Sequence, residues 1–239
     1  MPGSNDNSVR LQKFLSERGI ASRRRAAEII RSGRITVDGK KQLEPSFPVI
    51  AGKNLICIDG KDVQAAKPKA VTIALNKPRG YICSRSDKQG KTIFSLLPEH
   101  LQNLKPVGRL DKNSEGLLLM SNDGDLINRL THPSFEQEKK YRVSVEGTVD
   151  DKVLAKLRSR MVIEGYRIHP AQVEAIKKEG TVHTLEIILK EGRKRQIRHM
   201  CEHANLKVKR LVRVQIKNLT TKGLKPGEWR LIEDLRLET

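Results

Sequence analysis

The chain has 239 residues, enough for one large domain or for a small and a medium one, and 37% of them are apolar, which suffices for a packed core. Its 47 Lys and Arg outnumber 28 Asp and Glu and give a formal net charge of +19, which predicts a polyanionic partner, most commonly nucleic acid. Three widely spaced cysteines without a CxxC pair argue against a disulfide framework or a zinc knuckle, and neither a signal peptide nor a membrane-spanning run is apparent, so we expect a soluble cytoplasmic protein.

The first 62 residues predict a small domain of two helices and a small sheet, preceded by a disordered start at residues 1–7. Apolar residues at helical spacing predict a first helix that ends at Gly19, and Ser22 is a suitable N-cap for a second helix. Asp38-Gly39 and Asp59-Gly60 each follow a short apolar run, which is a strong signal for a hairpin. We therefore expect a compact α/β unit at residues 8–62.

This small domain is rich in basic residues and poor in acidic ones. Three arginines occupy the first turn of the predicted second helix, where the helix dipole makes cations unfavourable. Guanidinium groups and helix amides bind the same phosphate, so this arrangement favours contact with an RNA backbone, and a solvated charged face is the alternative. The residues predicted to contact RNA here are Arg10, Lys13, Arg23, Arg24, Arg25 and Arg34.

Residues 63–69 have little to bury and predict a linker to a second domain at residues 70–239. In that domain, apolar runs predict strands at 71–75, 107–110, 117–121, 141–145 and 183–189, and helical patterns predict helices at 124–130, 150–160 and 194–204. Because strands and helices do not alternate strictly, we expect an α+β fold with a mixed, largely antiparallel sheet flanked by helices.

Asp111 is the leading candidate for a catalytic group. It follows the predicted strand that ends at Leu110, and a loop then leads through Gly116 into another apolar strand. A carboxylate at the edge of a core is held rigidly and partly desolvated, as a nucleophile or general base requires. Capping of the turn through an Asx hydrogen bond is the alternative role for the same residue.

The predicted helix at 194–204 buries one stripe, formed by Ile197, Met200, Cys201 and Ala204, and carries basic residues beside it. Because Cys201 belongs to this stripe, we expect no metal at His199-x-Cys201-x-His203. Arg193 and Arg195 are predicted to contact RNA. Lys77, in a Lys-Pro-Arg-Gly loop, is predicted to do so from the rim of a cleft.

Two resemblances connect these patterns. The small domain, with Leu11-x-x-Phe14-Leu15, Ser22-Arg23-Arg24 and Val37-Asp38-Gly39, resembles the S4 RNA-binding domain. The larger domain carries in order Gly108-Arg109-Leu110-Asp111, Ser114-x-Gly116-Leu117-Leu118, Thr131-His132-Pro133, Glu138-Lys139-Lys140-Tyr141 and Glu191-Gly192-Arg193-x-Arg195-Gln196-Ile197-Arg198. These motifs are similar to those of the ribosomal RNA pseudouridine synthases, in the branch that begins with an S4 domain.

The second resemblance implies a role for each matching position. Asp111 becomes the essential catalytic carboxylate, and Arg109 helps displace the target base from its stack. Tyr141 packs on the uracil, and Arg198 keeps Asp111 ionised, because a nearby opposite charge favours the charged form of a carboxylate. No cofactor and no metal are implied. The implied substrate is ribosomal RNA, more specifically large-subunit RNA, as a folded stem-loop or within an assembling subunit, bound by a monomer.

Two other functions fit the same sequence. The first is a non-enzymatic RNA-binding or ribosome-assembly protein that keeps the catalytic fold. The second is a pseudouridine synthase that acts on tRNA. The combination of Arg109, Asp111, Tyr141 and Arg198 argues against the first, since binding alone does not require it.

Overall fold

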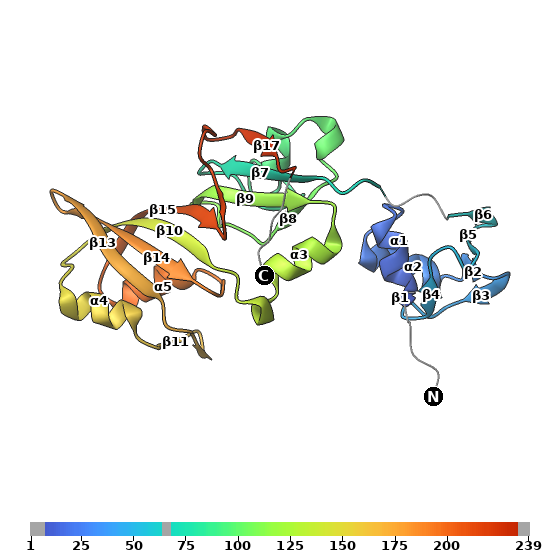
Figure 1. Cartoon of the computed structure of the whole chain (residues 1–239), viewed down its shortest axis with the longest axis horizontal. Coiled ribbons are helices and arrows are strands. Elements are labelled where there is room, and N and C mark those ends of the chain that lie inside the picture. Colours follow the sequence, from blue (N-terminus) through green and yellow to red (C-terminus); the bar gives the residue numbers. More distant parts are fainter. Residues whose placement is uncertain (1–7, 64–67, 234–239) are drawn as a thin grey trace. The chain divides into compact units, whose positions relative to one another are not determined.

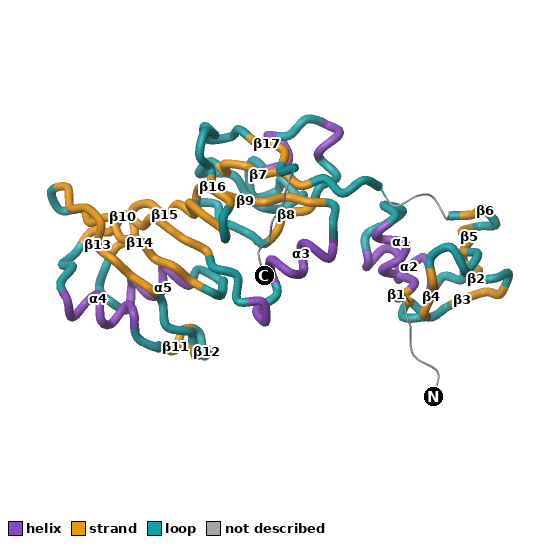
Figure 2. The backbone as a smooth tube through the Cα atoms, in the orientation of Figure 1, coloured by secondary structure: helices purple, strands orange, loops and turns teal. Residues whose placement is uncertain are grey.

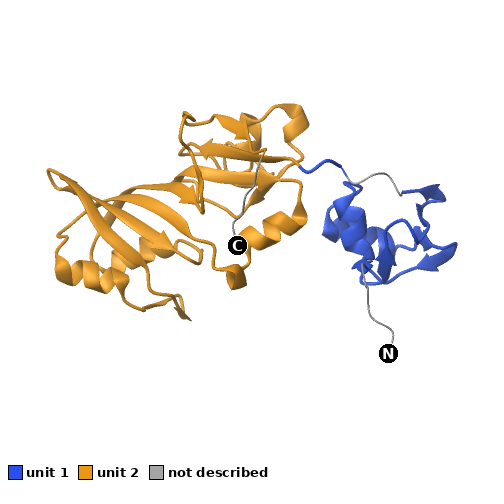
Figure 3. Cartoon of the chain, in the orientation of Figure 1, with its two compact units in different colours: residues 1–70 blue, residues 71–239 orange. Residues whose placement is uncertain are grey.

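The computed structural model describes residues 8–63 and 68–233 and divides into two compact units, residues 1–70 and 71–239 (Figure 3). The predicted disordered start at residues 1–7 lies outside the described residues, and so does the middle of the predicted linker, residues 64–67. Within the described ranges, no helix is long and apolar enough to cross a membrane.

Two helices form one side of the smaller unit, α1 (Leu11–Glu17) and α2 (Arg23–Arg31). Both bury their apolar faces in a core that also includes Ile35 and Ile56 of the small sheet. As predicted, Ser22 caps α2, and its hydroxyl accepts a hydrogen bond from the backbone N–H of Arg25 at 3.3 Å. The cap satisfies an amide that the helix itself leaves without a partner.

The small sheet contains both predicted hairpins. Its strands β3 (Lys40–Gln42), β2 (Ile35–Val37), β5 (Ile56–Ile58) and β6 (Lys61–Asp62) lie in that order and pair antiparallel. Asp38-Gly39 and Asp59-Gly60 make the two tight turns, and all four residues have positive φ, as a type I′ turn requires. A further pair, β1 (Ser8–Arg10) with β4 (Pro48–Ile50), was not predicted.

Nine of the described strands form the sheet of the larger unit: β7 (Thr72–Lys77), β8 (Lys105–Val107), β9 (Glu115–Ser121), β10 (Lys139–Glu146), β13 (Gln172–Glu179), β14 (Val182–Leu189), β15 (Lys207–Ile216), β16 (Leu219–Thr220) and β17 (Trp229–Leu231). Their order is β13-β14-β10-β15-β9-β7-β17, with β16 on β15 and β8 on β9 (Figures 1 and 2). Among the described strands, β15 and β9 are parallel and the other pairs of this sheet are antiparallel. The predicted mixed, largely antiparallel sheet is confirmed.

Helices cover different parts of this sheet. The helices α4 (Asp151–Arg158) and α5 (Gln196–His203) contact β13 and β15, and α3 (Gly124–Thr131) contacts β8 and β9 (Figure 1). Short 3-10 turns occur at Ile93–Leu96, Glu99–Leu101 and Pro133–Phe135. A separate hairpin, β11 (Val162–Ile163) with β12 (Tyr166–Arg167), packs on α5. The predicted α5 stripe of Ile197, Met200, Cys201 and Ala204 is buried.

Gly116 allows the parallel pair β9–β15 to form. Its φ is +99°, and a Cβ at this position would lie 2.2 Å from the carbonyl oxygen of Arg213 on β15. Only glycine tolerates both this backbone conformation and this approach. The pairing matters for the site, because it fixes where the loop before β9 leaves the sheet.

Candidate active site

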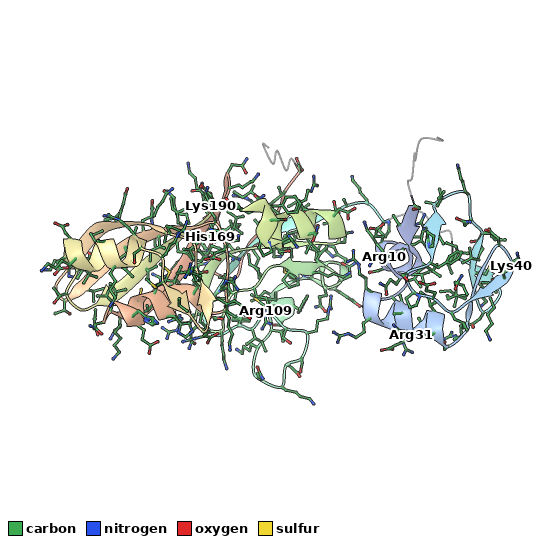
Figure 4. The ribbon with its side chains drawn as sticks, turned by 90° about the horizontal axis from the view of Figure 1, so that it is seen from below. Arg10, Arg31, Lys40, Arg109, His169 and Lys190 are labelled. Atoms are coloured by element: carbon green, nitrogen blue, oxygen red, sulfur yellow. The ribbon has the colours of Figure 1, made fainter. Side chains whose placement is uncertain are left out.

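A pocket of about 810 Å³ opens in the larger unit. Its wall is formed by the loop after β8, the start of β10, the β11–β12 hairpin, the segment between β14 and α5, and β15. Figure 4 labels two of its lining residues, Arg109 in the loop after β8 and Lys190 directly after β14. The lining also includes Asp111 and Tyr141, so the structure brings these two predicted site residues together.

Asp111 lies in a loop, and the predicted strand that ends at Leu110 is wrong. The strand β8 ends at Val107, because Gly108 has a φ of +76° and interrupts the extended backbone. Leu110 is nevertheless buried, and its carbonyl accepts a hydrogen bond from the Cys83 thiol at 3.3 Å. Asp111 therefore comes directly after the buried Leu110, and its side chain, which is 38% exposed, lines the pocket.

Lys77 holds this loop, and its predicted contact with RNA is wrong. The side chain is fully buried, and Nζ donates hydrogen bonds to the carbonyls of Pro78 at 3.1 Å, Asp111 at 3.1 Å and Ser114 at 2.7 Å. Burial lowers the pKa of Lys77, and the charge of Asp111 opposes that change. Lys77 ends β7 with its side chain directed inward, so its charge stabilises the backbone of the loop that carries Asp111 instead of contacting a phosphate.

The ion pair predicted between Arg198 and Asp111 is made by Arg195. Arg195 Nη1 lies 3.9 Å from Asp111 Oδ2, whereas Arg198 Nη2 donates to the carbonyl of Asn113 at 3.0 Å. The helix α5 starts at Gln196, two residues later than predicted, because Arg195 adopts a left-handed backbone with φ of +52°. Arg195 therefore lies at the helix start beside the carboxylate, and Arg198 reaches the backbone of the same loop.

The pKa of Arg198 is affected by the charge of Asp111. Burial and the neighbouring Arg195 lower the pKa of Arg198, and Asp111 acts in the opposite direction. Two guanidinium groups thus act on the loop that carries the carboxylate, one on its charge and one on its backbone. Both contacts hold the loop and its carboxylate in place.

Tyr141 forms part of the pocket and of the core, with 7% of its surface exposed. It pairs with Ile187 of β14 on one side and with Arg213 of β15 on the other. A ring in this position offers an aromatic surface to a planar ligand in the pocket.

Lys139 and Arg213 also line the pocket, and the sequence analysis missed both as site residues. Lys139 lies two residues before Tyr141 on β10, hence on the same face of the strand, and this spacing was the available signal. Burial, together with the charge of Arg213, lowers the pKa of Lys139 to about 8. Arg213 is 3% exposed and its Nε donates to the Leu117 carbonyl at 2.7 Å.

Arg109 is exposed at the pocket, two residues before Asp111. Arg193 and Arg195, predicted to contact RNA, also line it. A pocket lined by three carboxylates, an aromatic surface and a larger number of cations suits an anionic ligand with a planar ring. Among residues 8–63 and 68–233, no group of three or more His, Cys, Asp or Glu is placed to hold a metal ion.

The predicted RNA-binding residues of the smaller unit fall into two groups, exposed residues and residues with an acidic partner. Arg10, Arg23 and Arg24 are exposed, and Figure 4 shows Arg10 on this unit. Three others have acidic partners: Lys13 Nζ lies 3.3 Å from Glu17, Arg25 Nη1 lies 2.9 Å from Glu28, and Arg34 Nε donates to Asp59 Oδ1 at 3.0 Å. The hydrogen bond with Asp59 raises the pKa of Arg34.

Comparison with known families accounts for both units. The model described as S4 domain matches residues 9–55, and the model described as RNA pseudouridylate synthase matches residues 71–203, which contain Asp111, Tyr141 and Arg198. The chain belongs to the RNA pseudouridylate synthase family. It is therefore an enzyme of the pseudouridine synthase type with an N-terminal S4 domain.

Similar proteins of this family match over nearly the whole chain. An RNA pseudouridine synthase of Aquifex aeolicus is 38% identical over 93% of this chain and 89% of its own length. The dual-specificity RNA pseudouridine synthase RluF of Escherichia coli is 34% identical over 96% of this chain and 77% of its own. The ribosomal large subunit pseudouridine synthase B of Bacillus subtilis is 34% identical over 92% of this chain and 91% of its own length.

A solved structure agrees with these matches. A crystal structure of a pseudouridylate synthase superposes with a TM-score of 0.67 at 27% identity and covers 94% of this chain and 96% of that chain. The coverage of 94% of this chain includes residues of both units.

Proposed function

We propose that this protein converts a uridine of ribosomal RNA, in the large subunit, to pseudouridine in the cytoplasm. Three observations support this substrate: the net charge of +19, the S4 domain at residues 9–55, and the similar Bacillus subtilis protein named for the large ribosomal subunit. Basic residues on both units supply attraction to a folded polyanion, which is the main source of affinity for RNA.

The reaction requires few groups. The bond between ribose C1′ and N1 of the base breaks, and a bond from C1′ to C5 of the same base forms, with nothing gained or lost overall. Asp111 serves this reaction either by covalent attack or by taking the C2′ proton, and both routes require an ionised carboxylate. Arg195, at 3.9 Å, stabilises that charge.

Tyr141 and Arg109 act on the base, and Arg198, which does not line the pocket, acts on the loop. Tyr141 provides the surface on which the uracil packs, and Arg198 fixes the loop backbone at Asn113. The target base leaves its stack to enter the pocket, at a cost of a few kcal/mol, and Arg109 at the pocket displaces it. Contacts of the basic surfaces with the backbone offset that cost.

One observation carries the proposal: the wall of the 810 Å³ pocket contains an aromatic ring on β10 and an arginine-paired carboxylate on a loop that a buried lysine secures. A protein that only binds RNA has no need for a carboxylate there, since it repels the phosphates. This arrangement therefore favours catalysis over binding alone.

The substitution Asp111→Asn tests this function. It removes the charge and keeps the size of the side chain, so we expect isomerisation of ribosomal RNA to be lost while RNA affinity stays within about threefold of the wild type. Asp87→Asn, at an exposed position in the same unit, is the matched control and should leave both unchanged. Isomerisation by the Asp111→Asn protein at the wild-type rate would refute the role of this carboxylate.

Transfer RNA is a second candidate substrate. The similar Escherichia coli protein is named a dual-specificity RNA pseudouridine synthase, which supports testing a further RNA class. Pseudouridine formation on purified tRNA, measured beside ribosomal RNA with the same enzyme preparation, separates the two substrates.

A further inference from the structure

Tyr166 is an exposed aromatic residue in a chain that has few. Aromatic residues make up 3% of the sequence, and within the described residues the strongly exposed aromatic side chains are Phe135, at 45%, and Tyr166, at 57%. Tyr166 lines the pocket that holds Asp111. The core does not explain this ring, because most of its surface faces solvent.

The hairpin that carries Tyr166 is well fixed. Glu164 and Gly165 form its turn with φ of +48° and +79°, which is the type I′ geometry of a two-residue hairpin. The strand β11 packs on α5, and Glu164 Oε1 lies 3.5 Å from His199 Nε2 on that helix. Tyr166 is therefore displayed from a rigid element at the rim of the pocket.

Arg193 lies against the Tyr166 ring. Its Cζ is 4.4 Å from the ring centroid, a distance typical of a cation–π contact. Glu191 Oε2 lies 3.5 Å from Arg193 Nε and orients the guanidinium group. Glu191 is itself fixed, because its Oε1 accepts hydrogen bonds from Gln196 Nε2 at 2.8 Å and from the backbone N–H of His169 at 2.9 Å.

We propose that Tyr166 and Arg193 form a stacking platform for the unpaired nucleobase next to the target uridine. Single-stranded bases stack on aromatic rings and on guanidinium planes, and such contacts tolerate any base because every base has a π face. Tyr141 and Asp111 line this cavity from β10 and from the loop after β8, and the platform lies on its β11–β12 wall. The inference rests on the proposed function, since it assigns a binding surface to the nucleobase next to the reacting uridine.

The size and charge of the pocket fit two nucleotides. Its volume of about 810 Å³ is near the top of the range of about 300–1,000 Å³ found for small-molecule sites. Lys190 and Lys194 line it beside Arg193, so cations are available for the phosphate between the two nucleotides. An RNA segment with two extruded bases uses both aromatic surfaces.

The test compares substitutions of Tyr166 by their effect on RNA affinity. Tyr166→Ala removes the ring and should weaken binding to deproteinised ribosomal RNA from cells that lack this protein by about 5- to 100-fold, the usual loss for one stacked base. Tyr166→Phe keeps the ring and should bind within about twofold of the wild type. Val162→Ala is the matched control, because Val162 is an exposed apolar residue on the other strand of the same hairpin, and it should bind like the wild type.

Salt dependence separates stacking from charge. Tyr166→Ala removes no charge, so the slope of log affinity against log salt should not change, whereas Arg193→Gln should reduce the slope by about 0.7–0.9 if it contacts a phosphate. In the isomerisation assay, Tyr166→Ala should raise KM and leave kcat within about threefold. Wild-type affinity of Tyr166→Ala, or an equal loss in Tyr166→Phe, would overturn the platform.

The platform and the proposed function fail in different ways. RNA affinity is measured in the Asp111→Asn protein as well, so it does not depend on turnover. Loss of RNA affinity in Tyr166→Ala supports the platform whether or not the wild type forms pseudouridine in ribosomal RNA. A wild type that forms no pseudouridine there refutes the proposed function alone. Normal pseudouridine formation with full affinity in Tyr166→Ala refutes the platform alone.

Discussion

Replacing Lys77 by methionine tests how the catalytic loop is held. Methionine has a similar length and removes the ammonium group that donates to the carbonyls of Pro78, Asp111 and Ser114. Hydrogen bonds to charged groups contribute about 1.5–3 kcal/mol each. The Asp111 carbonyl keeps a second hydrogen bond, from the Ser114 N–H at 3.0 Å, which reduces its loss.

The removed charge also relieves a penalty, because burial lowers the pKa of Lys77 and hence disfavours its charged form. Since this relief offsets only part of three lost hydrogen bonds, we expect the free energy of unfolding to fall by at least about 1.5–3 kcal/mol, the contribution of one such bond. The loop that carries Asp111 should also move. Since misplacement of a reacting group by about 1 Å costs on the order of 100-fold in rate, we expect kcat to fall by about that factor.

The assay follows the catalytic unit alone. Trp229 is the single tryptophan of the chain and packs against the core of the larger unit, so its fluorescence during urea unfolding reports on that unit. Lys112→Met is the control: Lys112 is an exposed lysine of the same loop, and its Nζ donates to the Gln89 carbonyl at 3.0 Å. Equal unfolding midpoints for the two variants, with unchanged kcat, would refute the role assigned to Lys77.

Three further predictions follow from the pocket. The pKa of Lys139 is about 8 in the folded protein against an ordinary 10.5, so between these pH values the unfolded chain binds more protons than the folded one. The free energy of unfolding should therefore rise with pH across this window, and it should rise less in Lys139→Met. Urea titrations at several pH values measure both changes. Gly116→Ala should destabilise the fold by about 2–4 kcal/mol in thermal unfolding, because the new methyl group meets the backbone of Arg213. Arg195→Gln should lower kcat by only about two- to fivefold, because an exposed ion pair contributes about 0.2–1 kcal/mol. Arg198→Gln removes a charged hydrogen bond to the loop and should lower kcat by about 10- to 100-fold. The reverse order of these two effects would contradict the geometry.

Local patterns predicted local structure well. The two Asp-Gly turns, the Ser22 cap and the buried stripe of α5 all follow from residues close in the sequence, and the structure confirms them. The fold class follows as well, because the lengths and types of most elements were recognisable. Asp111 and Tyr141 share one pocket, as the resemblance implied.

Long-range contacts account for the errors. A lysine in a Lys-Pro-Arg-Gly segment looks solvent-exposed, and only its contact with a loop 34 residues later makes Lys77 fully buried. The strand β15 was missed, although it lies between β10 and β9 within the sheet, because four basic residues interrupt its apolar positions. Arg195 was predicted to contact RNA and Arg198 to pair with Asp111, because the left-handed backbone that places Arg195 beside the carboxylate has no signal in the sequence.

The most direct test of the central claim is a map of pseudouridines in ribosomal RNA from cells with and without this protein. Carbodiimide modification followed by reverse transcription detects each pseudouridine as a stop. Our account predicts that one or a few stops in large-subunit RNA disappear without the protein, return with the wild-type gene, and stay absent with Asp111→Asn. Identical maps in the presence and absence of the protein would contradict it.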